Sequence, residues 1–254
     1  MGAINLDHVD LGYGDKVVMR DVTLDLPAAA LTTVIGPNGS GKSTLLRAIS
    51  GLMSPLRGTI SIDRDPAGRR AACAHVLQQT ANAPLLPLTV REAVTMGRYP
   101  RTGMLRRLSA EDREAVDRSL ERLGVTDLAT RQLRELSGGQ RQRVLVAQGL
   151  AQEAPVLLLD EPVTGLDLVS QRHIVRAIAE EVEAGRTVLL TTHDLNEAGQ
   201  ADVVILVAGR VVAAGMPSEV LSPENLREAY GPQLIDTGKG TALLPDVSHD
   251  HVHG

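Results

Sequence analysis

The stretch that decides the fold is LTTVIGPNGSGKSTLLRAISG, Leu31 to Gly51. A short apolar run leads into a glycine-rich loop, and the apolar spacing after the loop is that of a helix. GPNGSGKS (36–43) matches the pattern G-x-x-x-x-G-K-[ST] in the strand–loop–helix context that this pattern requires. In such loops, backbone N–H groups converge on phosphates at a helix N-terminus. We therefore predict a phosphate site formed by Gly36, Asn38, Gly39, Ser40, Gly41, Lys42, Ser43 and Thr44.

Two side chains of this loop have specific expected roles. Lys42 would reach the β- and γ-phosphates of a nucleotide, and the Ser43 hydroxyl would bind Mg²⁺. A glycine-rich turn that contains a lysine by chance is the alternative, and the flanking strand and helix patterns argue against it.

Acidic residues follow a second apolar run, VLLLDEP (156–162). Asp160 ends a predicted buried strand, where a carboxylate is costly unless it serves an ion, so we expect it to hold Mg²⁺ through water. Glu161 can then orient or deprotonate the attacking water as a general base. His193 follows a third apolar run, TVLLTT (187–192), at the strand edge where open α/β sheets bind ligands. It would bond the γ-phosphate or the attacking water.

A second anion site is indicated by LSGGQ, Leu136 to Gln140. Ser137 and Gln140 have the spacing of a capping box, so a helix is expected to begin here. Two glycines in a first helical turn are unfavourable for helix stability, so capping alone does not require Gly138 and Gly139. Bare amides at a helix start bind anions. The motif either caps its own helix only or completes the phosphate site of another chain.

The wider pattern predicts an α/β fold. Alternating runs such as VVMRDVTLDL (17–26), with GTISI (58–62), favour antiparallel strands near the N-terminus. Residues 109–125 have a serine N-cap, early acids and helical apolar spacing. We expect a core of residues 1–77 and 154–230, a helical insertion at 78–153, and a polar tail at 231–254.

Composition narrows the class of protein. The chain has 254 residues, 43% apolar and 22% charged, and a net charge of −5, which argues against a general nucleic-acid binder. No apolar run approaches the roughly 18 residues of a membrane span. The single cysteine, Cys73, excludes an internal disulfide, and we interpret it as a small core or surface residue.

Five motifs in this order resemble those of the ATP-binding-cassette (ABC) ATPases: GPNGSGKST, LSGGQRQRV, VLLLDEP, TGLD and TTHD. The resemblance covers about residues 3–230. It implies a P-loop NTPase (RecA-like) core with an N-terminal antiparallel β subdomain and an inserted helical subdomain. It also implies a head-to-tail dimer around ATP and Mg²⁺, in which Ser137, Gly138, Gly139 and Gln140 face the nucleotide of the second copy.

The resemblance assigns three further residues. Gln78 matches the glutamine that contacts Mg²⁺, helps Glu161 activate water and relays nucleotide state to the membrane subunit, although the adjacent Gln79 leaves the register open. Asp167 in TGLD matches the acid that crosses the dimer interface, where the family more often has S-A-L-D. Tyr13 matches the aromatic residue that stacks on adenine.

One segment discriminates within the family. PLTVREAVTMGRYPRTGMLRR (87–107) resembles importers of zinc or manganese, and also those of haem and iron–siderophores; SPENLREAYG (222–231) looks closest to the metal-ion branch. Residues 97–100 also have the pattern of a helix-terminating turn. The implied protein is the ATPase of a divalent-metal importer at the cytoplasmic face of a membrane. Its implied partners are permease subunits and, through them, an extracytoplasmic binding protein.

Alternatives remain open at this level. They are a haem or siderophore importer, and a soluble cassette ATPase without a transport role, such as an iron–sulfur assembly factor. His249, His251 and His253 alternate in the tail, so an extended chain would place three imidazoles on one side as candidate ligands for a transition metal. An inert tail is the other interpretation.

Overall fold

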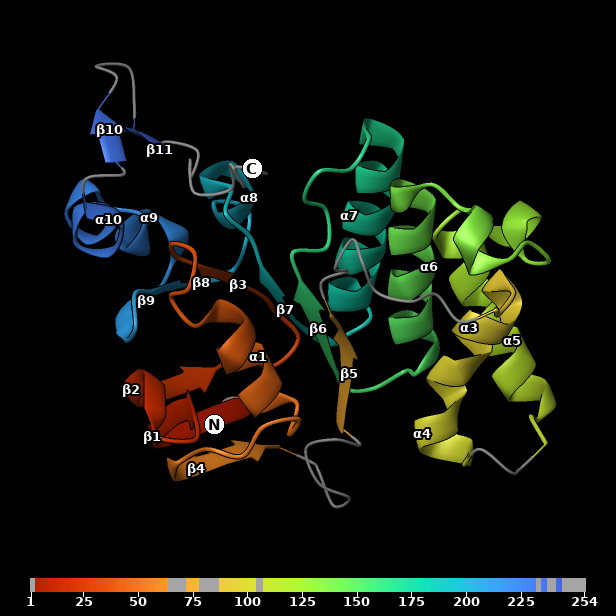
Figure 1. Cartoon of the computed structure of the whole chain (residues 1–254), viewed down its shortest axis with the longest axis horizontal. Coiled ribbons are helices and arrows are strands. Elements are labelled where there is room, and N and C mark those ends of the chain that lie inside the picture. Colours follow the sequence, from red (N-terminus) through yellow and green to blue (C-terminus); the bar gives the residue numbers. More distant parts are fainter. Residues whose placement is uncertain are drawn as a thin grey trace, which may run out of the picture.

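The chain is organised around a six-stranded sheet with the order β5-β6-β7-β3-β8-β9, in which only β9 is antiparallel to its neighbour (Figure 1). The strands are β3 (Leu31–Ile35), β5 (Cys73–Val76), β6 (Val156–Asp160), β7 (Thr187–Thr191), β8 (Val203–Val207) and β9 (Val211–Gly215). This computed structural model describes residues 3–63, 72–77, 87–103, 107–231, 234–236 and 241–243.

The continuous apolar runs of the sequence form the centre of this sheet. Every residue of β6 and β7 is buried, as expected for parallel strands that are covered on both faces. The register pairs Thr191 of β7 with Asp160 on one side and with Val34 of β3 on the other. Strands β3, β6 and β7 therefore end together at one edge of the sheet.

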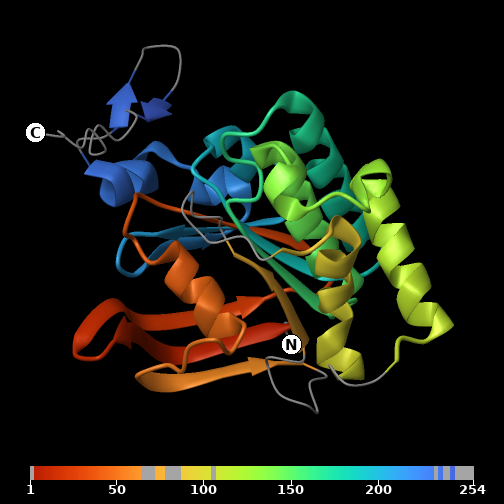
Figure 2. The same ribbon diagram turned by 45° about the vertical axis from the view of Figure 1, so that its right-hand side comes forward.

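A smaller antiparallel sheet has the order β2-β1-β4. Its strands are β1 (Ile4–Tyr13), β2 (Lys16–Leu26) and β4 (Arg57–Ile62). Exposure alternates over residues 21–26, the second half of β2, as the sequence predicts. Helix α1 (Lys42–Ile49) lies between this sheet and the central one (Figure 2). A single apolar cluster joins Leu6 of β1, Leu46 of α1 and Leu158 of β6.

Most of the described helices lie between β5 and β6 in the sequence and pack beside the sheet. Side chains of α3, α5 and α6 share one apolar cluster with Leu157 and Leu159 of β6. Since successive strand residues face opposite sides, α6 covers one face of β6 and α1 the other. The segment contains α3 (Val90–Thr95), α4 (Tyr99–Thr102), α5 (Ala110–Arg122), α6 (Gly138–Ala151) and the 3-10 helices Met96–Arg98, Thr126–Leu128 and Leu133–Glu135.

The remaining elements complete the core. Helix α7 (Leu168–Glu183) connects β6 to β7, and the short helices α8 (Leu195–Ala198), α9 (Pro217–Val220) and α10 (Pro223–Tyr230) pack near β8. Strands β10 (Leu234–Asp236) and β11 (Thr241–Leu243) pair where the sequence predicts only a polar tail, because three residues carry too little periodicity to signal a strand. Among the described residues, no helix has the length and apolar character needed to cross a membrane.

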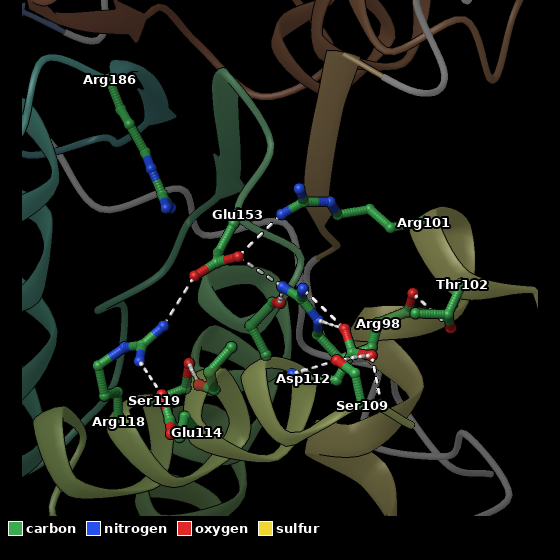
Figure 3. Close-up of polar contacts among 12 residues, drawn as sticks. Arg98, Arg101, Thr102, Ser109, Asp112, Glu114, Arg118, Ser119, Glu153 and Arg186 are labelled. Atoms are coloured by element: carbon green, nitrogen blue, oxygen red, sulfur yellow. Dashed lines mark hydrogen bonds and ion pairs between the residues drawn. The ribbon is translucent and has the colours of Figure 1, made fainter. Parts of the chain in front are cut away.

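A buried arginine ties three helices together (Figure 3). The Arg98 side chain, only 3% exposed, contacts Asp112 of α5 at 2.8 Å, Glu153 at 2.7 Å and the Ala151 carbonyl at the end of α6 at 2.7 Å. The neighbouring Gly97 lies so close to α6 that a Cβ would be 2.2 Å from the Gln148 carbonyl oxygen. The expected helix-terminating turn at 97–100 is wrong in detail: a 3-10 turn leads into α4, which ends at Thr102 with Gly103 as its C-cap residue.

The Arg98→Met variant is expected to lose about 3 kcal/mol of unfolding free energy, because it leaves the buried Asp112 carboxylate with only its hydrogen bonds from Ser109. Arg91→Met is the matched control. The Arg91–Asp117 pair, at 2.6 Å, is about half exposed on each side, so its loss should cost less than about 1 kcal/mol. Urea denaturation of both variants measures the difference, and equal costs would show that burial of Arg98 is energetically unimportant.

Candidate functional site

The glycine-rich loop follows β3 and ends at Gly41, the N-cap residue of α1. Gly41 has a φ of 107°, a backbone conformation that other residues rarely adopt. At the other end of the loop, a Cβ on Gly36 would lie 2.0 Å from the carbonyl oxygen of Val207, so no larger residue fits. The loop is thus packed against β8 and leads directly into the N-terminus of α1.

Lys42 is buried over this loop. Its ammonium donates to the carbonyl oxygens of Gly36 at 2.8 Å and Pro37 at 3.1 Å. Burial lowers the pKa of Lys42, while the charges of Glu161 and Asp160 act in the opposite direction. The lysine and the two acids, which are far apart in the sequence, therefore act on each other at one edge of the central sheet.

The two acids are held at the end of β6. Asp160 is 4% exposed and accepts a hydrogen bond from the Thr191 hydroxyl at 2.7 Å. Glu161 follows with a φ of 48°, and its N–H donates to the same hydroxyl at 2.9 Å. Sequence reasoning did not single out Thr191; its signal is a hydroxyl residue at the end of a buried apolar run. His193 is exposed two residues further along, beyond the end of β7.

The expected capping box at the LSGGQ motif is present. Ser137 is the N-cap residue of α6, its hydroxyl accepts from the Gln140 N–H at 3.2 Å, and the Gln140 side chain accepts from the Ser137 N–H at 3.0 Å. The two glycines differ. A Cβ on Gly138 would meet nothing within 4 Å, whereas a Cβ on Gly139 would lie 2.5 Å from Asp167 Oδ2.

Asp167 caps its own helix. Its carboxylate oxygens accept from the Ser170 N–H at 2.9 Å and from the Ser170 hydroxyl at 2.8 Å. The backbone hydrogen bond from Ser170 is the main cause that lowers the pKa of Asp167. The side chain thus has defined intrachain partners at the N-terminus of α7, next to Gly139.

Tyr13 lies at the end of β1 with half of its surface exposed. Arg47 of α1 donates to its hydroxyl at 3.1 Å. A hydrogen bond from Thr44 is the largest cause that lowers the pKa of Tyr13. The ring is therefore anchored at its hydroxyl end to the helix that follows the glycine-rich loop, with part of its surface open to a ligand.

The remaining predicted site residues divide into two groups. Gln78, with the alternative Gln79, and the tail residues His249, His251 and His253 lie outside the described residues. Cys73 is buried in the apolar cluster that contains α1, so of the two interpretations, core or surface, the core one holds. Within the described part of the chain, no group of three or more histidine, cysteine or acidic residues could hold a metal ion.

Comparison with known proteins supplies the family. The family model described as ABC transporter matches residues 19–164. The manganese transport system ATP-binding protein MntB of Bacillus subtilis (strain 168) is 39% identical over 236 residues, covering 92% of this chain and 94% of that protein. The ferric enterobactin transport ATP-binding protein FepC of Escherichia coli (strain K12) is 39% identical over 249 residues, covering 94% and 92%.

The fold agrees as well. The dimeric structure of the bacterial ABC transporter cassette MJ0796 matches with a TM-score of 0.73 and 29% identity, covering 84% of this chain and 98% of that one. The predicted α/β architecture, with its antiparallel and helical parts, is confirmed. Cassettes of this kind form dimers and assemble with permease subunits. The chain therefore belongs to the ABC transporter family, and it is an ATP-binding subunit whose ATP hydrolysis is coupled to transport.

Proposed function

We propose that this ATPase lies at the cytoplasmic face of a membrane and powers the import of a divalent transition metal, manganese or zinc. The observation that carries the proposal is the similarity to manganese transport ATPases along almost the whole chain, MntB of Bacillus subtilis among them. The second candidate is import of an iron–siderophore, because the sequence identity of this chain to FepC and to the iron(3+)-hydroxamate import protein FhuC is nearly the same as its identity to MntB. An extracytoplasmic binding protein would deliver either substrate to the permease.

The loop geometry supports ATP binding by residues 36–44. The loop leads directly into the N-terminus of α1, where backbone N–H groups can bind an anion, and the Lys42 ammonium, held by two loop carbonyls, is in place to exchange these partners for the β- and γ-phosphates. The half-exposed Tyr13 ring would stack on adenine. The Ser43 hydroxyl and the Gln78 side chain would bind Mg²⁺ directly and Asp160 would hold it through water; the bound ion would neutralise phosphate charge.

The acids and His193 divide the hydrolytic work in this proposal. Glu161 follows the end of β6 and would accept a proton from the attacking water. His193, beyond the end of β7, would hydrogen-bond the γ-phosphate or that water. Thr191, the last residue of β7, is hydrogen-bonded to the Asp160 carboxylate and to the Glu161 N–H. The two acids and the end of β7 that leads to His193 therefore lie at the same sheet edge.

The second half of the site would come from another copy. Helix α6 begins at LSGGQ and covers the opposite face of β6 from α1, so the two helix N-termini of one chain lie on different sides of the sheet. A head-to-tail partner can present Ser137, Gly138, Gly139 and Gln140 to the nucleotide that the first chain holds. Asp167, beside Gly139, would lie at the same interface.

The test is metal uptake by the chain reconstituted with its permease in vesicles. ATP-dependent accumulation of Mn²⁺ or Zn²⁺, suppressed by the other divalent ion and not by a ferric siderophore, supports the proposal. Uptake of the ferric chelate alone favours the second candidate. If the chain hydrolyses ATP but no membrane protein co-purifies with it, the soluble, non-transport ATPase is favoured instead.

A further inference from the structure

The hydroxyl group of Thr191 lies between the two acids that the proposed function uses. Thr191 is the last residue of β7, it is fully buried, and the register places it directly opposite Asp160. Asp160 and Glu161 are consecutive residues of the neighbouring strand end, so one side chain of β7 contacts both.

The chemistry of the groups fixes the direction of each hydrogen bond. An ionised carboxylate only accepts and a backbone N–H only donates, whereas a hydroxyl can do both. The single Thr191 proton is therefore directed at Asp160 Oδ1, 2.7 Å away, and its oxygen accepts from the Glu161 N–H at 2.9 Å. One hydroxyl thus orients a side chain and anchors a backbone amide at the same time.

The anchored backbone is unusual. Glu161 has a φ of 48°, in the left-handed region that residues other than glycine seldom occupy. This conformation turns the chain immediately after β6 and determines where the Glu161 side chain leaves the backbone. The bond from the Glu161 N–H to Thr191 is a tertiary contact that favours this turn.

Other buried threonines show that such bonds are not a general requirement of this sheet. Thr33 of β3 is 1% exposed, and its hydroxyl has no hydrogen-bond partner in the described part of the chain. Thr192, the next residue, points elsewhere: its hydroxyl donates to Glu197 at 2.6 Å and accepts from the Asp194 N–H. The chain just before His193 is therefore fixed on two sides, toward β6 and toward α8.

We propose that Thr191 is a positioning residue for ATP hydrolysis in this chain: its hydroxyl orients the Asp160 carboxylate toward Mg²⁺ and holds the Glu161 backbone in the turn that aims the general base. The inference rests on the proposed roles of Asp160 and Glu161. It adds a buried residue that acts through both acids.

The test replaces the hydroxyl by a methyl group of similar size. In Thr191→Val, ADP binding measured by calorimetry in EDTA should be unchanged, while the gain in affinity on adding Mg²⁺ should fall about ten-fold. The Mg²⁺ concentration for half-maximal ATPase activity should rise by a similar factor, and kcat should fall. Thr191→Ser, which keeps the hydroxyl, should restore all three values, a pattern that a purely structural role would not produce.

Thr33→Val is the matched control, because it makes the same replacement in an adjacent strand where no hydrogen bond is lost. It should behave like the unaltered chain. If valine crowds the strand end and prevents folding, Thr191→Ala removes the hydroxyl without adding volume and takes the same measurements. Unchanged Mg²⁺ dependence and kcat in a folded hydroxyl-free variant overturn the inference alone, whereas rapid hydrolysis by Glu161→Gln would overturn the proposed role of Glu161 on which the inference rests.

Discussion

Hydrolysis of ATP by the Glu161→Gln variant is expected to be about 10²–10⁴-fold slower than that of the unaltered chain, with ATP binding retained. Glutamine keeps the shape of the side chain but cannot accept a proton from water. Since binding continues while turnover stops, the variant should accumulate as an ATP-bound dimer. Phosphate release, nucleotide affinity and light scattering after size exclusion measure the three quantities.

The control for this result is Glu224→Gln, the same change in the first turn of α10, where the side chain is exposed. It should leave turnover unchanged. Rapid hydrolysis by Glu161→Gln would place the general base elsewhere. A variant that hydrolyses slowly but stays monomeric with ATP would separate the catalytic role of Glu161 from the proposed dimer mechanism.

The Gly138→Asp variant is expected to abolish ATP-driven dimerisation and lower the rate of hydrolysis by about 100-fold or more, the scale of losing a donor to a developing anion. A Cβ on Gly138 would meet nothing within 4 Å among the described residues, so the monomer should fold normally. An acid in the first turn of α6 is also favourable to the helix. Binding of ATP to the monomer should therefore be unchanged, and loss of that binding would contradict the assignment of LSGGQ to the partner's nucleotide.

Gly139→Asp is the informative comparison. The same dimerisation defect is expected, but here the new Cβ lies 2.5 Å from both Asp167 Oδ2 and Ser170 Oγ of the same chain. Overpacking of this kind costs about 1–3 kcal/mol, so the melting temperature of the monomer should drop by several degrees. Equal melting temperatures for the two variants would show that the N-terminus of α7 adjusts without cost.

The sequence was sufficient for the parts of the fold whose signals are local. Only neighbouring residues determine the buried runs before Asp160 and Thr192, the alternation in the second half of β2, the serine N-cap at 109 and the capping box at Ser137. Each of these elements forms as predicted. The need for glycine at position 36 was also predictable, because the loop pattern requires a residue without a side chain at its first position.

Contacts between distant segments could not be predicted in this way. The bonds from Thr191 to the acids depend on the parallel register of β6 and β7, which no local pattern specifies. The approach of Gly139 to Asp167 likewise depends on how α6 and α7 pack against each other. The sequence therefore suggested the same role for Gly138 and Gly139, whereas in the structure only Gly139 lies against Asp167. The register of Gln78 against Gln79 stays a prediction.

The closeness of Gly97 to the Gln148 carbonyl gives the helical part of the molecule a mechanical property. Together with the bonds of Arg98, it fastens the segment 96–102 to the far end of the helix that starts at LSGGQ. That helix has 14 residues and is about 21 Å long. A displacement of Tyr99 would therefore be transmitted along the helix to Ser137 at its other end.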